Sequence, residues 1–130
     1  MLLSSAPAPV PDAAAAAALF APLAGEAVEG GGAAYLDKDR RLLAVRLFGD
    51  GMADRVTPPL RLIVGDALRL DAAGVVLAHN HPSGDARPSR ADLALTRRLA
   101  TALDVLGVRL LDHLVLVPGA NSSFRALGLL

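Results

Sequence analysis

Apolar and polar residues follow one another along the chain in blocks that predict interleaved strands and helices. Residues 33–36 and 41–48 are mostly apolar and flank the polar sequence Asp-Lys-Asp-Arg, which predicts a β-hairpin. After Pro59, apolar residues at positions 60, 63, 64, 67 and 68 form one face of a helix, and residues 89–106 have a second helical pattern that ends at Gly107. Residues 74–78 are continuously apolar, which is typical of a strand buried on both faces.

Residues 108–110 and 114–117 are expected to add further strand before a turn at Pro118-Gly119. The resulting order, β-β-α-β-α-β, predicts a layered α/β domain in which helices flank a mixed β-sheet. Functional groups in such domains gather near the carboxyl end of a central strand. The loop after residues 74–78 is therefore the expected position of the functional site.

The N-terminal segment, residues 1–25, is expected to lie outside this domain, which would occupy residues 26–130. Residues 1–11 form a Pro/Ala/Ser-rich tail that is predicted to be disordered. Asp12 is a suitable N-cap for a short Ala-rich helix ending near Pro22, for which packing or a homodimer contact is the expected role. The run Gly30-Gly31-Gly32 predicts an unusual backbone path before the hairpin.

Composition limits the function classes that fit the chain. Its 130 residues, 53% of them hydrophobic, suffice for one domain with a core. The formal net charge of zero gives no support for tight nucleic-acid binding, although a local arginine patch could still contact DNA. The absence of cysteine excludes disulfides, cysteine-ligated zinc and thiol nucleophiles, and no Walker or dinucleotide-binding glycine motif is present.

Targeting signals are also missing from the sequence. No Lys or Arg precedes Lys38, so the N-terminal residues do not resemble a signal peptide. The apolar stretch 13–23 is too short to span a membrane and contains Pro22. We therefore expect a cytoplasmic protein without membrane association.

The sequence His-Asn-His-Pro-Ser-Gly, directly after the central apolar run, has the layout of a mononuclear metal site. His79 and His81 are residues i and i+2 at the end of a strand, so both imidazoles can point to the same side and reach one ion. Asp92, in the first turn of the next predicted helix, is the obvious third ligand. Two histidines and one carboxylate with an open fourth position favour zinc, which makes its bound water acidic enough to ionise near neutral pH.

Other interpretations of the motif remain open. The histidine pair could belong to a hydrogen-bonded loop that binds no metal. Ser89 and Asp92 have the spacing of a capping box at the start of a helix, and a carboxylate bound to zinc could not serve fully as a cap. The histidines at the preceding strand end favour the metal interpretation.

Three further residues are candidates for supporting roles. His113, on a late predicted strand beside Asp112, is either a buried histidine bonded to backbone, which is the favoured interpretation, or a residue that orients a metal ligand or contacts the substrate. Arg87 and Arg90 flank the motif and are either solvated charges or groups that bind an anionic part of a substrate.

These residues resemble a known motif. His-x-His, seven residues, then Ser-x-x-Asp is similar to the JAMM/MPN+ (JAB) metalloprotease pattern, and it matches at His79, His81, Ser89 and Asp92. The longer run His-Asn-His-Pro-Ser-Gly-x-x-x-Pro-Ser-x-x-Asp resembles the bacterial RadC branch, and the similarity covers residues 29–130. The resemblance implies a JAB/MPN domain with a cytidine-deaminase-like arrangement of sheet and helices.

The resemblance also implies roles for individual residues. His79, His81 and Asp92 would bind Zn²⁺, and the Ser89 hydroxyl would stabilise a tetrahedral intermediate. A general-base glutamate lies on an early strand in JAMM enzymes, and counting back from residues 35–37 places Glu29 there. Glu29 could also be a solvated loop charge, like Glu26, the other glutamate of the chain.

Two functions follow from the resemblance. The first is a zinc-dependent metallohydrolase of the RadC-like family that cleaves a peptide or isopeptide bond in an unknown substrate. The second is a non-catalytic or degenerate JAB module that acts through protein or DNA contacts, in line with the DNA-repair label of RadC proteins. The glycines after Glu29 and the sequence Leu60-Arg61-Leu62, where the family has Pro-Arg-Glu, favour the second.

Overall fold

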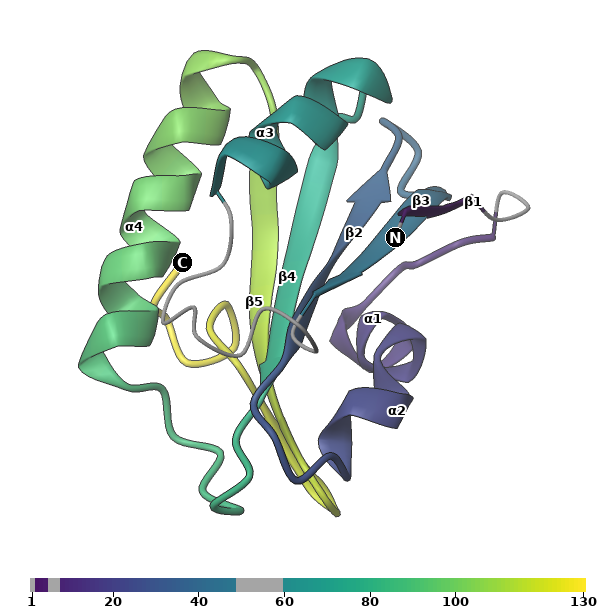
Figure 1. Ribbon diagram of the computed structural model, residues 1–130. Helices are drawn as coiled ribbons and strands as arrows, with labels where there is room; N and C mark the ends of the chain where they lie inside the picture. The colour runs from purple at the N-terminus through teal and green to yellow at the C-terminus, as the bar shows by residue number, and fades with distance from the viewer. Residues whose placement is uncertain (1, 5–7, 49–59) are drawn as a thin grey trace.

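One mixed β-sheet with helices on both faces makes up the part of the chain that the computed structural model describes, residues 2–4, 8–48 and 60–130 (Figure 1). The helix start that the sequence predicts at Pro59 and the loop that it predicts around Gly49 and Gly51 lie outside these residues. The elements are, in order, β1 (Leu2–Ser4), α1 (Ala13–Leu19), α2 (Ala21–Ala24), β2 (Gly31–Leu36), β3 (Leu42–Phe48), α3 (Leu60–Arg69), β4 (Gly74–Asn80), α4 (Arg90–Val105), β5 (Arg109–Val117) and β6 (Ala120–Ser123).

The strand order β1-β3-β2-β4-β5-β6 places β4 near the centre of the sheet. Strand β4 runs antiparallel to β2 and parallel to β5, so the predicted α/β class with a mixed sheet is confirmed. The predicted hairpin is also confirmed, and Asp37 stabilises its turn by accepting the N–H groups of Asp39 and Arg41. No helix of the described ranges is long and apolar enough to cross a membrane.

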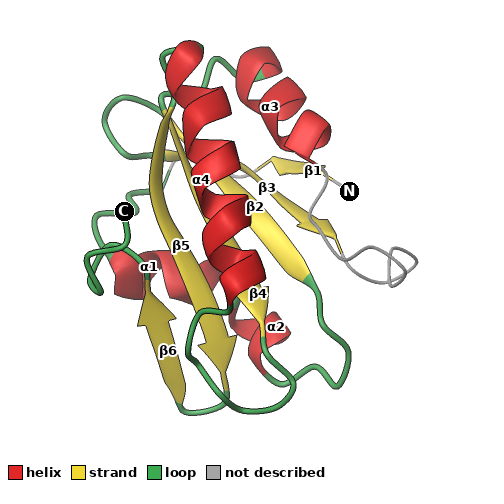
Figure 2. Ribbon diagram, turned by 90° about the vertical axis from the view of Figure 1, so that its left-hand side faces the viewer, coloured by secondary structure: helices red, strands yellow, loops and turns green. Residues whose placement is uncertain are grey.

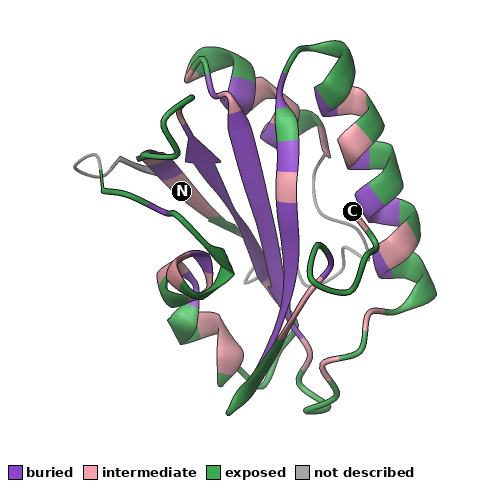
Figure 3. Cartoon of the chain, turned by 180° about the vertical axis from the view of Figure 1, so that it is seen from behind, coloured by how far each residue is buried: buried purple, intermediate pink, exposed green. Residues whose placement is uncertain are grey.

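Helices α3 and α4 cover one face of the sheet, and α1 and α2 cover the other (Figures 1 and 2). Because side chains alternate along a strand, neighbouring residues of β2 and β4 belong to different cores. The core under α3 and α4 contains Tyr35, Ile63, Val75, Leu77, Leu99 and Leu103, among others. The core under α1 and α2 contains Ala34, Leu36, Val76, Ala78 and Phe20. Strand β4 is buried along its whole length, as its apolar sequence predicts (Figure 3).

The N-terminal segment is part of the sheet and of the core, so the prediction of a disordered tail is wrong for its described residues. Strand β1 pairs antiparallel with β3, and Val10 donates its N–H to the carbonyl of Arg40. Val10 and Phe20 are fully buried, because their side chains cover the apolar face of the sheet that α3 and α4 leave open. Asp12 caps α1 as predicted, by accepting the N–H of Ala15.

The glycine run before the hairpin has a different role from the expected one. Gly31 and Gly32 lie inside β2 as ordinary extended residues, two positions earlier than the predicted start of the strand. A Cβ on Gly31 would lie 2.8 Å from the ring of Phe48, and one on Gly32 would lie 2.7 Å from the ring of Phe20. The glycines therefore make room for aromatic rings on the two faces of the sheet.

Two other sequence-based boundaries need correction. Strand β5 continues through residues 111–113, and β6 extends the sheet beyond the predicted turn at Pro118-Gly119. The buried side of α4 consists of Asp92, Leu95, Thr96, Leu99 and Leu103, so it includes two polar residues that hydropathy does not count.

Candidate metal centre

The two histidines of the motif lie at the carboxyl end of β4 and face α4. His79 occupies the same side of β4 as Val75 and Leu77, which pack under α3 and α4. Its Nε2 atom lies 2.8 Å from Nε2 of His81. The i, i+2 spacing therefore brings both imidazoles to one point, as the sequence predicts.

The carboxylate of Asp92 meets the two histidines from the first turn of α4. Its Oδ1 lies 3.2 Å from Nε2 of His79, and its Oδ2 lies 3.3 Å from Nε2 of His81. Burial alone would raise the pKa of Asp92, but the contact with Nε2 of His79 and the hydrogen bond from the N–H of Ser89 hold the pKa of this carboxyl well below its usual value. Asp92 is therefore an anion at this point.

Asp92 is at the same time part of a complete capping box. Its side chain accepts the N–H of Ser89 at 2.8 Å, and the hydroxyl oxygen of Ser89 accepts the N–H of Asp92 at 3.0 Å. The cap orients the carboxylate, and the remaining lone pairs still face the histidines. Capping and metal binding are thus compatible here, although the sequence suggested a conflict between them.

Glu29 approaches the histidines from the segment before β2. One ligand atom each of Glu29, His79 and His81 lie within 4.8 Å of one another. Glu29 is exposed, whereas Asp92 is buried. The two carboxylates therefore meet the histidine pair from different elements, Asp92 at closer range.

Asn80 fixes the segment that carries Glu29. Located between the two histidines on β4, Asn80 points to the opposite face of the sheet and is fully buried. Its side-chain oxygen accepts the N–H of Gly30 at 2.6 Å, and its amide donates to the carbonyls of Glu26 and Val28. These three bonds bind residues 26–30 to the end of β4, between the two histidines.

The loop after β4 orients His81. The Nδ1 atom of His81 lies 2.8 Å from the carbonyl oxygen of Asp85, and a carbonyl can only accept, so Nδ1 carries the proton. In the neutral ring Nε2 then has a lone pair, which points toward His79 and Asp92. Loop residue Ala86 is in turn bound through its carbonyl by the hydroxyl of Ser122 on β6.

The arginines of the motif do not contact Asp92. Arg87 is bound to Asp85 on the exposed loop, and its guanidinium lowers the pKa of Asp85 to about 2. Arg90 is exposed in the first turn of α4. Ser89, which caps that helix, is exposed at the site, and its hydroxyl proton is not required by the cap.

Sequence reasoning missed Asn80, Thr96 and Asp85 as parts of the site. Asn80 could have been found from strand alternation, because a polar residue that must point into an apolar core needs partners. Thr96 contacts His113 and the backbone of Asp92, as described below, and its position one helical turn after Asp92 was the available signal. The role of Asp85 is performed by its backbone carbonyl, which no sequence pattern encodes.

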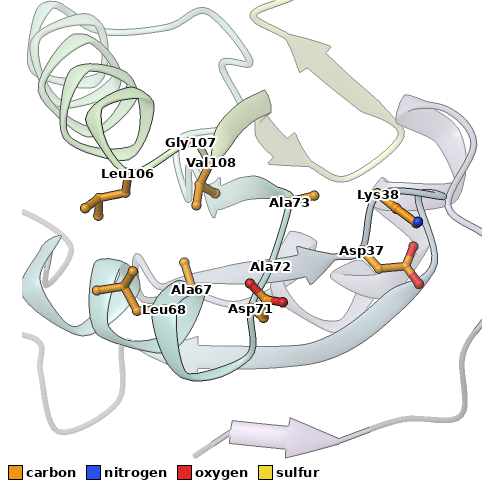
Figure 4. Close-up of a pocket in the computed structure, with 10 residues that line it drawn as sticks. All are labelled: Asp37, Lys38, Ala67, Leu68, Asp71, Ala72, Ala73, Leu106, Gly107 and Val108. Atoms are coloured by element: carbon orange, nitrogen blue, oxygen red, sulfur yellow. The ribbon is translucent and has the colours of Figure 1, made fainter.

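A cleft of about 440 Å³ lies elsewhere, at the other end of the sheet (Figure 4). It is lined by the hairpin turn and by the carboxyl ends of α3 and α4, including Asp37, Lys38, Leu68 and Leu106. Strand β4 begins beside this cleft at Gly74 and ends at the histidines, about 20 Å away at the usual rise per residue. The histidine cluster is therefore separate from the cleft.

Comparison with known proteins adds independent findings. A family model described as RadC-like JAB domain matches residues 10–129. A UPF0758 protein of Rhodobacter capsulatus is 46% identical over 96 residues, which are 74% of this chain and 45% of that protein. A relative in Methylibium petroleiphilum is 48% identical over 96 residues (74% and 43%), and one in Acidovorax sp. strain JS42 is 45% identical over 107 residues (82% and 45%). The chain spans less than half the length of these relatives.

Proposed function

We propose, for a chain that belongs to the RadC-like JAB domain family, that His79, His81 and Asp92 bind a zinc ion and that the site hydrolyses an amide or isopeptide bond. The observation that supports this most strongly is the convergence of two imidazole Nε2 atoms and one anionic carboxylate at the end of β4.

The spacing of the donor atoms fits a tetrahedral ion. Two ligand atoms that are each about 2 Å from a zinc ion in tetrahedral geometry lie about 3.3 Å apart. The contacts of Asp92 with His79 and His81 are 3.2 and 3.3 Å. The histidine nitrogens, 2.8 Å apart, need to separate only slightly. Zinc held there would supply Lewis-acid polarisation of a carbonyl group and a water of lowered pKa.

Glu29 and Ser89 are the residues that we assign to proton transfer and oxyanion stabilisation. Glu29 is a carboxylate near the ligands that is not needed to complete the set of three, so it is free to accept a proton from water and return it to the leaving nitrogen. The hydroxyl of Ser89 accepts in the capping box and can donate its proton to a developing oxyanion.

Metal analysis of the purified protein is the first test. The wild-type chain is expected to contain about one zinc per chain, as the three-ligand site requires, and the His79→Ala/His81→Ala double variant is expected to contain none. A wild-type chain without metal after incubation with zinc would contradict the proposal and favour a degenerate JAB module that works through binding partners.

The two glutamates of the chain offer a matched pair for the catalytic assignment. Glu29→Gln is expected to abolish hydrolysis of an isopeptide-linked or peptide substrate while zinc content stays at the wild-type level. Glu26→Gln, an exposed neighbour on the same segment, is the control and should retain activity. A Glu29→Gln variant as active as the Glu26→Gln variant would remove Glu29 from the mechanism.

A further inference from the structure

His113 lies directly behind His79 and is held on every side. Its side chain is fully buried on β5, and its Nε2 atom is 2.7 Å from Nδ1 of His79. The ring of Phe124 stacks on it, with 4.4 Å between centroids and 21° between planes. Phe124 also donates its N–H to the carbonyl of His113, so ring and backbone are fixed together.

A β-bulge aims His113 at the site. In the register of β4 and β5, Val75 pairs with Leu110 and Val76 pairs with Asp112, so Leu111 has no partner. Leu110 faces α3 and α4, and regular alternation would turn His113 to the opposite face. The extra residue restores His113 to the face of His79. Bulges are commonly used in this way, to re-aim a side chain beside a functional site.

The hydrogen-bond donors and acceptors in the row of contacts from Thr96 through His113 to His79 indicate which ring nitrogens carry a proton. The hydroxyl of Thr96 donates to the carbonyl of Asp92 at 2.7 Å, so its oxygen is the acceptor for Nδ1–H of His113 at 2.6 Å. The Nε2 atom of a neutral His113 is then unprotonated and accepts Nδ1–H of His79. The Nε2 atom of His79 is left with a lone pair, directed at His81 and Asp92.

We infer that His113 is a positioning residue, which fixes the ring of His79 in the tautomer that presents an Nε2 lone pair to the metal centre. The inference deepens the proposed function and rests on it for the identity of the ion. Histidine ligands generally donate their second N–H to a fixed acceptor, most often a carboxylate or a backbone carbonyl. Here the acceptor is the neutral imidazole of His113. Thr96 on α4 fixes the tautomer of His113 in turn.

Two substitutions at position 113 separate positioning from packing. His113→Phe keeps an aromatic ring against Phe124 and removes the acceptor, whereas His113→Gln restores an acceptor oxygen near the place of Nε2. We expect His113→Phe to weaken zinc binding about 10- to 100-fold, measured by competition with a chromophoric chelator, and His113→Gln to recover most of that loss. Equal zinc affinity of His113→Phe and the wild type would overturn the inference.

A second readout needs no metal. Long-range ¹H–¹⁵N correlation spectra of the zinc-free wild type should show His79 with its proton on Nδ1, and the His113→Phe variant should show a mixture of tautomers. A wild-type His79 protonated on Nε2 would overturn the inference. If the wild type binds no zinc, the proposed function fails, while these spectra still decide whether His113 positions His79.

Substitutions at Thr96 test the first contact in the row from Thr96 through His113 to His79. Thr96→Ser keeps the hydroxyl and Thr96→Val replaces it by a methyl group of similar size. The valine variant should bind zinc more weakly than the serine variant, because His113 loses the acceptor that fixes its tautomer. Equal zinc affinity and equal His79 spectra in the two variants would contradict the claim that Thr96 acts on His79 by fixing the tautomer of His113.

Discussion

Two carboxylates lie between the same face of the sheet and its helices, and their surroundings differ in one decisive respect. Asp66 on α3 is fully buried and accepts bonds from the hydroxyl of Tyr35 at 2.8 Å and from the guanidinium groups of Arg46 and Arg69. Asp92 on α4 meets two imidazoles and a backbone N–H. In the described ranges, no arginine or lysine forms an ion pair with Asp92.

The difference separates a structural cluster, around Asp66, from the candidate metal centre, around Asp92. The charge of Asp66 is balanced inside the chain, and although burial favours its neutral form, the bonds from Arg46 and Tyr35 lower its pKa. Burial raises the pKa of Tyr35, which keeps its hydroxyl proton as a donor. Around Asp92, two nitrogen lone pairs and an anion face each other without a fixed positive charge. Such an arrangement favours a bound cation.

Removal of the charge of Asp66 should have the largest effect on stability. Asp66→Asn leaves the mostly buried Arg46 guanidinium without its anion, and breaking a buried pair in this way costs about 3–5 kcal/mol. Urea unfolding should show this loss, whereas Asp104→Asn, on the exposed side of α4, should change stability by about 0.5 kcal/mol or less. A similar loss of stability in both variants would mean that the buried ion pair of Asp66 with Arg46 contributes no more than an ordinary surface charge.

The same cluster predicts the direction of an acid effect. The pKa of Asp66 is lowered in the folded state, mainly by Arg46 and Tyr35 against the opposing effect of burial, while its unfolded value is about 3.9. Its contribution to stability is therefore complete above about pH 4 and is lost as pH falls through the lower folded value. The stability difference between wild type and Asp66→Asn should shrink in this acid range. A difference independent of pH would contradict the assignment.

Added zinc should stabilise the protein through Asp92 and not through Asp66. At a free zinc concentration 100 times its dissociation constant, the wild type should gain about 2.7 kcal/mol in unfolding free energy, and a chelator should remove the gain. Asp92→Asn keeps an oxygen for the capping N–H of Ser89 but loses the anion, so it should fold without zinc and gain nothing from it. Equal stabilisation of both proteins by zinc would place the ion elsewhere.

The sequence predicts the histidine pair of the candidate site better than it predicts the residues that pack around the site. Strand alternation brings His79 and His81 together, and the match of the RadC-like family over residues 10–129 confirms the resemblance inferred from the motif. The aim of His113 depends on a bulge at Leu111, which apolar periodicity does not reveal. The place of the N-terminal residues depends on a sheet face that only the assembled fold leaves uncovered. Long-range packing, rather than local pattern, decides both.

Ser89 offers the smallest and most discriminating change around Asp92. Its hydroxyl oxygen caps α4, but the bond that orients the Asp92 carboxylate comes from the backbone N–H of Ser89, which alanine also has. Ser89→Ala should therefore cost about 1 kcal/mol in unfolding free energy, the usual value of an N-cap, while zinc affinity stays unchanged. If the hydroxyl assists an oxyanion, the turnover rate of the folded, zinc-loaded Ser89→Ala variant should also fall. Ser89→Thr, which keeps a hydroxyl, should restore both the turnover rate and the unfolding free energy. A loss of zinc affinity in Ser89→Ala would show instead that the capping hydroxyl, and not the backbone, holds the carboxylate in place.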